Sequence, residues 1–289
     1  VAAKGTDNET IFEVTGKTTN SLTGVSRLRG ANVDLDAQTP LTCLNNEEFI
    51  NQFERATGAE VDTGTDEAKI VTPKAIADSL IQTGWTPARE TWTYKSATQI
   101  YAAGDVTGKY QKGDKIKLTQ TSTKYFYITA VSAYDSGNNR TTLTVTGGTD
   151  YSVANATITN PYYSKAENPQ GFPDWFKWTP TITGGGSMTI SSVAISLAKF
   201  KIQGKAVTIN LSASFTTGGT AHNTVNVTLP VNAGSFAPSG AYVIVTGGSP
   251  QGGIVMLGSN YMMFRKYDGG SFELAANRQI GCSFIYEMA

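Results

Sequence analysis

The feature that most constrains the fold is a strict alternation of apolar and polar residues near the C-terminal end. Apolar side chains fill every second position in three stretches: Val207, Ile209, Leu211, Ala213 and Phe215; Val225, Val227 and Leu229; and Ile280, Cys282, Phe284 and Tyr286. This period belongs to β-strands with one buried face. Glycine pairs such as Gly218-Gly219 separate the stretches. We therefore predict a β-sandwich or jelly-roll-like domain over residues 181–289, preceded by an aromatic and proline-rich connector at residues 166–180.

Residues 87–165 contain a second group of strand signals. Residues 115–119 alternate polar and apolar side chains, residues 125–131 are a dense run of β-formers, and residues 141–146 supply a returning strand. Turn-forming residues at 135–139 lie between the last two. Short strands joined by such turns predict a small β-barrel, which we expect to act as a spacer.

Residues 1–86 add helix signals to an extended start. Weak alternation predicts extended structure over residues 1–45. A helix is then predicted over residues 45–58 because Asn45 and Glu48 form a capping-box pattern and Gly58 suits the C-terminal cap.

A second helix is predicted after a polar linker at residues 60–67. Thr72 suits its N-cap and Pro73 its first turn. A helix of about ten residues is marginal by itself, so we expect both helices to pack in a homotrimer. Four apolar residues are the predicted trimer contacts: Phe49, Phe53, Ile76 and Leu80.

Composition and charge narrow the class of protein. Charged residues make up 16% of the chain, against about 25% in typical soluble domains, a profile that favours a turn-rich β-protein of a virion or an extracellular space. Lys plus Arg and Asp plus Glu both number 23, so no nucleic-acid partner is expected. No apolar run approaches the roughly 18 residues of a membrane helix, so no membrane insertion is expected.

Three short motifs occur in an order seen in one family. Residues 63–79 (TGTDEAKIVTPKAIADS) resemble an acidic turn leading into a short helix that recurs in tail-fibre and receptor-binding proteins of tailed bacteriophages. Residues 23–27 (TGVSR) resemble a turn of N-terminal fibre regions, and residues 178–182 (WTPTI) resemble the start of C-terminal fibre domains. The resemblance implies a homotrimer located on the virion. Its N-terminal region would meet other virion proteins, and its C-terminal domain a host-surface glycan or protein.

Few residues offer catalytic chemistry. The single histidine, His222, lies in a strand connection without a neighbouring Cys, Asp or Glu, which favours a turn residue over a metal ligand or triad member. Asp268 and Glu273 flank a Gly-Gly turn and come nearest to a glycosidase pair, but exposed hairpin carboxylates are the simpler interpretation. We therefore expect no enzyme activity, no catalytic residue, no metal and no cofactor.

The strongest binding signal mixes large rings with hydrogen-bonding groups, as sugar sites do. The predicted binding residues are Asn260, Tyr261, Phe264, Arg265, Tyr267 and Asp268. The alternative is that Met262 and Phe264, or Tyr261 and Met263, form the inward face of a strand.

A weaker binding signal is a group of five lysines near Tyr110. They are Lys109, Lys112, Lys115, Lys117 and Lys124. Such a group could meet an anionic glycan or lipopolysaccharide, but a solvated strand face is the simpler interpretation.

These observations favour a mainly β, trimeric tail fibre or receptor-binding protein of a tailed bacteriophage. Two alternatives stay open. One is a head fibre, decoration or collar protein without a receptor, and the other is a polysaccharide depolymerase.

Overall fold

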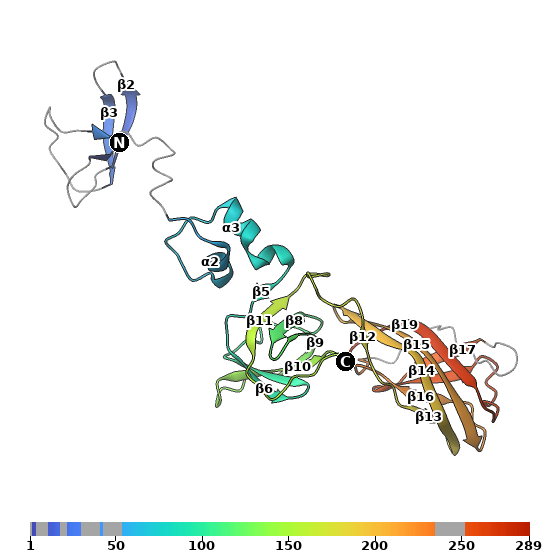
Figure 1. Ribbon diagram of the computed structural model, residues 1–289. Helices are drawn as coiled ribbons and strands as arrows, with labels where there is room; N and C mark the ends of the chain where they lie inside the picture. The colour runs from blue at the N-terminus through green and yellow to red at the C-terminus, as the bar shows by residue number, and fades with distance from the viewer. Residues whose placement is uncertain (1, 4–10, 18–21, 30–40, 43–53, 235–251) are drawn as a thin grey trace. The chain divides into compact units, whose positions relative to one another are not determined.

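The chain is mainly β and forms two compact units, residues 1–79 and residues 80–289 (Figure 1). Strands account for 48% and helices for 7%, which confirms the predicted fold class of strands with few short helices. Among the described residues, no helix is long and apolar enough to cross a membrane. The computed structural model describes residues 2–3, 11–17, 22–29, 41–42, 54–234 and 252–289.

The first unit begins with a four-stranded antiparallel sheet in the order β3-β2-β1-β4. Its strands are β1 (Ala2–Ala3), β2 (Ile11–Lys17), β3 (Leu22–Arg29) and β4 (Leu41–Thr42). The longest ladder joins β2 to β3, with Val14 opposite Val25. These strands confirm the extended structure predicted for this part of the chain.

The predicted helix over residues 45–58 is wrong at its C-terminal end, and residues 45–53 lie outside the described residues. Gly58 opens a helix, α2 (Gly58–Thr63), instead of ending one. The reason is a capping box centred on Thr57, whose hydroxyl accepts the Glu60 N–H at 3.3 Å while the Glu60 carboxylate accepts the Thr57 N–H at 2.7 Å. Part of the predicted polar linker is therefore helical.

The second helix, α3 (Pro73–Asp78), starts where the sequence predicts. The Thr72 hydroxyl accepts the Ala75 N–H at 3.2 Å, and the proline occupies the first turn. The helix is shorter than the predicted ten residues. Ser79 ends it because its N–H and its hydroxyl both donate to the Ile76 carbonyl, at 3.1 and 2.7 Å.

The second unit begins with a 3₁₀ turn, η1 (Leu80–Thr83), and a seven-stranded antiparallel sheet in the order β5-β11-β8-β9-β10-β7-β6. The strands are β5 (Thr86–Pro87), β6 (Trp92–Ser96), β7 (Gln99–Ala103), β8 (Lys115–Thr119), β9 (Thr123–Val131), β10 (Arg140–Thr146) and β11 (Thr159–Ser164). The three strands predicted in this region are confirmed as β8, β9 and β10. Their alternate residues, such as Ile116, Leu118 and Ile128, are fully buried.

The predicted small barrel is wrong in one respect, because the sheet does not close among the described residues. The edge strands β5 and β6 follow each other in the chain and do not pair. The Ala88 N–H donates to the carbonyl of Pro161 on β11, whereas the Thr91 carbonyl accepts the N–H of Ala103 on β7. Between them Arg89 has a φ of 69°. This left-handed residue turns the chain from one sheet edge to the other without a direct ladder.

The C-terminal part is a sandwich of two four-stranded antiparallel sheets, β12-β14-β15-β19 and β13-β16-β18-β17 (Figure 1). Side chains from both sheets share one core, including Phe200, Ile209, Val227 and Phe284. This arrangement confirms the predicted sandwich. The strands are β12 (Phe176–Lys177), β13 (Ile182–Gly184), β14 (Met188–Gln203), β15 (Ala206–Gly219), β16 (Val225–Thr228), β17 (Gly253–Leu257), β18 (Tyr261–Lys266) and β19 (Arg278–Glu287).

Candidate functional site

The predicted binding segment at residues 260–268 divides between core and surface. Phe264 is 0% exposed and packs with Met262 in the sandwich core. Its predicted place in a binding surface is therefore wrong, because β18 points this side chain inward. The alternative inward face formed by Met262 and Phe264 is the one observed.

The other predicted binding residues lie at the surface. Tyr261 and Arg265 are half-buried on the outer face of β18, and Asn260 is exposed just before it. Tyr267 is 82% exposed in the turn after the strand. Asp268 accepts the Gly270 N–H at 2.8 Å and lies 3.7 Å from the Lys266 ammonium group. The Asp268 carboxylate thus shapes the turn.

The residues considered for catalysis have structural partners. His222 Nδ1 lies 2.9 Å from the Thr224 hydroxyl, and Glu273 is paired with Arg278 at 2.9 Å. Among the described residues, no group of three or more His, Cys, Asp or Glu side chains is arranged to hold a metal ion. The polar groups near the Gly269-Gly270 turn therefore act in loop structure.

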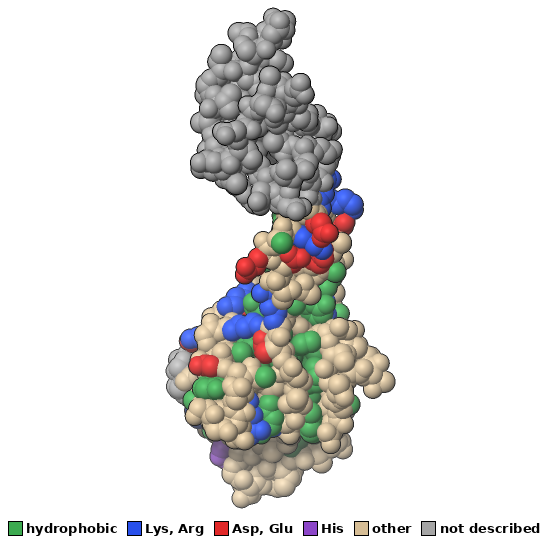
Figure 2. All heavy atoms as spheres, turned by 90° about the vertical axis from the view of Figure 1, so that its left-hand side faces the viewer, with side chains coloured by type: hydrophobic (Ala, Val, Ile, Leu, Met, Phe, Trp, Pro, Cys, Tyr) green, Lys and Arg blue, Asp and Glu red, His purple; other side chains and the backbone are tan. Residues whose placement is uncertain are grey.

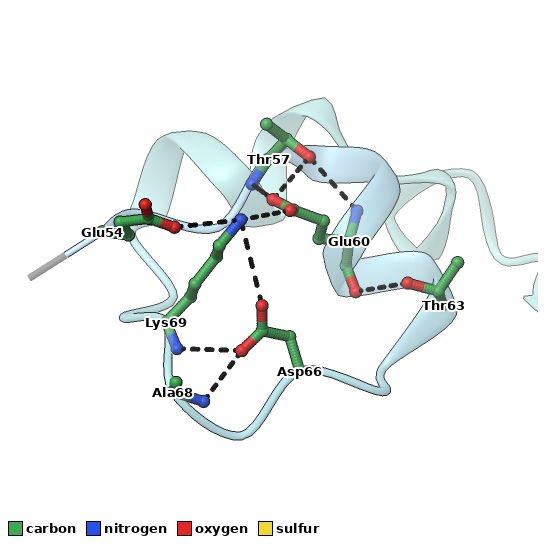
Figure 3. A network of polar contacts seen from close by, with 7 residues as sticks. All are labelled: Glu54, Thr57, Glu60, Thr63, Asp66, Ala68 and Lys69. Atoms are coloured by element: carbon green, nitrogen blue, oxygen red, sulfur yellow. Dashed lines mark hydrogen bonds and ion pairs between the residues drawn. The ribbon is translucent and has the colours of Figure 1, made fainter.

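The first residues of the motif at residues 63–79 form, together with residues 54–62, a small network centred on Lys69 (Figure 3). The Lys69 ammonium group lies 2.5 Å from the Glu60 carboxylate, 3.4 Å from that of Glu54 and 3.9 Å from that of Asp66. Asp66 also accepts the N–H groups of Ala68 and Lys69, at 2.8 and 3.2 Å. The hydrogen bond from Lys69, helped by Thr57, lowers the pKa of Glu60 to about 2.

The backbone closes the same segment into one piece. The Ile70 N–H donates to the backbone carbonyl of Glu54 at 2.9 Å, and the Ile70 carbonyl accepts the Ala56 N–H at 3.0 Å. These two bonds bring together the ends of the segment that contains α2. Acidic and basic side chains lie beside each other over this part of the chain (Figure 2). The conspicuous polar residues of the motif therefore hold the local fold.

Apolar side chains of this segment point to solvent. Val71 is 51% exposed and Ile76, on α3, is 40% exposed, whereas the face of α3 that carries Ala75 is buried. Ile76 was a predicted trimer contact, and Leu80, another, lies beyond the end of α3 in η1. Phe49 and Phe53, the remaining two, lie outside the described residues. Exposed aliphatic side chains on a short helix leave a face that a partner can cover.

Within the second unit, aromatic rings of residues 166–180 join the seven-stranded sheet to the sandwich. The Phe172 ring lies 5.0 Å from the Tyr127 ring on β9. The Phe176 ring lies 5.3 Å from that of Tyr127 and 6.0 Å from that of Phe200 on β14. Aromatic pairs at these spacings add specific stabilisation beyond burial, so this junction is a packed part of the unit.

A cleft of about 260 Å³ opens at this junction. Tyr127, Phe172 and Trp175 supply aromatic side chains to its lining. Its polar lining residues are Lys115, Glu167, Asn168, Asp174, Lys201 and Gln203. The combination of rings, amides and charges is the one that the sequence led us to expect around residues 260–268.

Lys115 is the most unusual group in the cleft. It is only 6% exposed, and its ammonium group donates to the Ala166 carbonyl at 3.2 Å. The rings of Tyr127 and Phe172 each lie 5.7 Å from that nitrogen. Burial lowers the pKa of Lys115, with Asp114 and Glu167 acting in the opposite direction.

This cleft was not predicted from the sequence, although Lys115 belongs to the group of five lysines near Tyr110. The structure disperses that group. Lys109 pairs with Glu90 at 2.6 Å, Lys117 lies over the Trp85 ring at 4.7 Å, and Lys124 donates to Ser152 at 2.8 Å. Trp175 was visible as part of the aromatic connector, and its proximity to a buried lysine depends on tertiary packing.

Comparisons with known proteins identify no relative. No protein-family model matches the chain, and no curated protein or solved structure matches it.

Proposed function

We propose that this chain is a non-enzymatic structural protein of a tailed-bacteriophage particle, a fibre-type protein that attaches the particle to the host surface. The observation that carries the proposal is the phage-like motif at residues 63–79, found in order with the motifs at residues 23–27 and 178–182. The first part of the motif at residues 63–79 belongs to a folded piece, residues 54–70, that is held by the Lys69 network. A segment that folds as a unit can recur among proteins that share it.

The proposed assembly is a homotrimer. Its support is the exposure of Ile70, Val71 and Ile76 in the first unit, together with short helices, α2 and α3, of six residues each. Helices of this length depend on packing for stability, and three copies around an axis would cover the exposed aliphatic side chains. A trimer also turns three weak sites into one strong attachment.

The outer surface of the second unit suits a particle protein. On the face seen in Figure 2, backbone and side chains that are neither hydrophobic nor charged make up most of the surface, with scattered hydrophobic side chains and fewer charged ones. Strands such as β15 and β19 bury every second side chain. Such strands would make this mainly β unit a rigid support. The N-terminal region would meet other virion proteins.

Two measurements test the proposal. Light scattering of the purified chain at micromolar concentration is expected to give three times the chain mass, and a stable monomer would count against the trimer. An electron-microscopy label on intact particles is expected to mark fibres, and a particle without label would overturn the virion assignment. Host-cell binding separates the receptor role from a head fibre, decoration or collar protein, which would leave cells unbound.

A further inference from the structure

The buried ammonium group of Lys115 forms no close ion pair, although Asp114 and Glu167 attract it electrostatically. Among the described residues, no carboxylate oxygen lies within 4.0 Å of it. Two less buried lysines differ in this respect, since Lys69 has three carboxylates around it and Lys109 has Glu90 at 2.6 Å. A buried cation without a counter-charge is costly.

One of the three N–H donors of Lys115 is used, by the Ala166 carbonyl. The neighbouring Asp114 attracts the lysine electrostatically, but its carboxylate accepts the Gln111 N–H at 3.0 Å and forms no hydrogen bond with Lys115. The unused donors of Lys115 belong to a side chain that lines the cleft. A ligand with an oxyanion would complete this site by charge-assisted hydrogen bonds.

Aromatic surface is available beside this cation. Trp175 is half-buried in the cleft lining, with the Lys199 and Lys201 ammonium groups 4.8 and 5.2 Å from its ring centroid. These lysines make the ring a cation-bearing platform. The exposed Asn168 at the same cleft supplies an amide that can bond hydroxyl groups. The exposed Gln203 amide donates to Glu167 at 2.5 Å and retains its carbonyl oxygen as an acceptor.

Lys115 also lines a neighbouring cavity. A second cavity of about 160 Å³ shares Lys115, Glu167 and Gln203 with the cleft and adds Lys112 and Lys165. The lining of the two hollows contains four lysines and three acids, so anions are favoured slightly over cations.

From these observations we infer that the junction cleft binds an acidic saccharide, whose carboxylate meets the Lys115 ammonium group while the apolar face of a sugar ring lies against Trp175. The inference names a receptor chemistry for the proposed attachment protein. The receptor role of the saccharide rests on the proposed function, whereas saccharide binding by the cleft does not depend on that function.

The test compares a charged sugar with a neutral one on the full chain. Saturation-transfer NMR and calorimetry with glucuronic acid are expected to show binding at least tenfold tighter than with glucose. Lys115→Met is expected to remove that tenfold preference, because it keeps the length of the side chain and deletes the charge. Trp175→Ala is expected to weaken the binding of both sugars.

The matched control is Lys117→Met. Lys117 lies two residues further along the same face of β8, over Trp85 and Tyr162, and its replacement should leave glucuronic acid binding unchanged. Thermal unfolding verifies that each variant is folded. Equal affinity of the wild type for glucuronic acid and glucose would overturn the inference, as would unchanged glucuronic acid binding by Lys115→Met.

Small anions distinguish a sugar site from a simple anion site. Acetate and inorganic phosphate are expected to compete at least tenfold more weakly than glucuronic acid, and equal competition would overturn the saccharide assignment. Labelling of intact particles is read separately. Sugar binding without particle labelling would contradict the proposed function alone, and labelling without sugar binding would contradict this inference alone.

Discussion

Gly113 and Gly204 bring the seven-stranded sheet and the sandwich into backbone contact. A Cβ atom at Gly113 would lie 2.5 Å from the carbonyl carbon of Gly204, and Gly113 has a φ of 90°. No side chain fits at Gly113, so this glycine determines how closely the walls of the adjoining cavity come together, whereas a Cβ at Gly204 would meet nothing within 4 Å.

Gly113→Ala is expected to lower the free energy of unfolding of the full chain more than Gly104→Ala does. Both glycines have a left-handed φ, but nothing lies within 4 Å of a Cβ at Gly104, so that variant measures backbone strain alone, about 1–2 kcal/mol. The steric clash at Gly113 adds about 1–3 kcal/mol. Urea unfolding measures both, and equal losses would contradict the close contact.

Gly58→Ala is expected to separate α2 from α3. A Cβ at Gly58 would lie 2.6 Å from the carbonyl carbon of Asp78, whereas alanine by itself favours a helix over glycine by about 1 kcal/mol. The expected result is faster amide exchange in residues 54–79, measured by mass spectrometry. Gly108→Ala, with nothing within 4 Å of its Cβ, is the control. Slower exchange in Gly58→Ala would show that helix propensity outweighs packing.

Amide protection in α2 is expected to fall in acid because of Glu60. Its pKa is about 2 in the folded chain, against 4.5 as the ordinary value. The stabilisation by charged Glu60 is therefore complete above about pH 4.5 and is lost as the pH falls toward 2. Exchange protection factors of the Val61 and Gly64 amides measure this change. Glu60→Gln should remove the pH dependence, and the neighbouring exposed Glu67→Gln should retain it.

Phe264→Ala and Tyr267→Ala are expected to differ sharply although they are three residues apart. Phe264 lies on β18, which pairs with β16 on one side and with β17 on the other, and its side chain is fully buried. Its truncation should therefore cost about 3–5 kcal/mol. The exposed Tyr267 should cost less than about 0.5 kcal/mol. Thermal unfolding of the full chain measures both. Similar stabilities of the two variants would refute the inward orientation of Phe264.

Cys282 is expected to resist thiol reagents in the folded chain. Burial in the sandwich core raises the pKa of its thiol to about 12, so the reactive thiolate is scarce near pH 8. The measurement uses Cys43→Ser, which leaves Cys282 as the remaining thiol. Labelling should be slow under native conditions and complete in denaturant. Fast native labelling would place this strand residue at the surface.

Local patterns in the sequence predicted much of the fold. Alternation along β15 and β19 identified buried faces because a strand repeats its orientation every two residues. Thr72 and Pro73 identified the start of α3 because capping depends on neighbouring residues. The same local reasoning misplaced the first helix end, where the Thr57–Glu60 pair makes Gly58 a starting residue.

The tertiary structure decided the sites. Phe264 and Tyr261 lie on opposite faces of β18, and the core shared with the other sheet of the sandwich buries the first and leaves the second half-buried. Among the described residues, the seven-stranded sheet stays open because its edge strands β5 and β6 do not pair, and the left-handed Arg89 lies between them. Neither result follows from residue type, because each depends on which segments lie together in the folded chain.

The alternation of apolar and polar residues thus determined the sandwich and its inward-facing side chains. Only the tertiary structure turned Lys115 from one member of a lysine group into a buried cation beside Phe172 and Trp175. The physical reason is range. Periodicity and capping act over a few residues, whereas the burial of a charge depends on segments that are distant in the sequence and meet only in the folded chain.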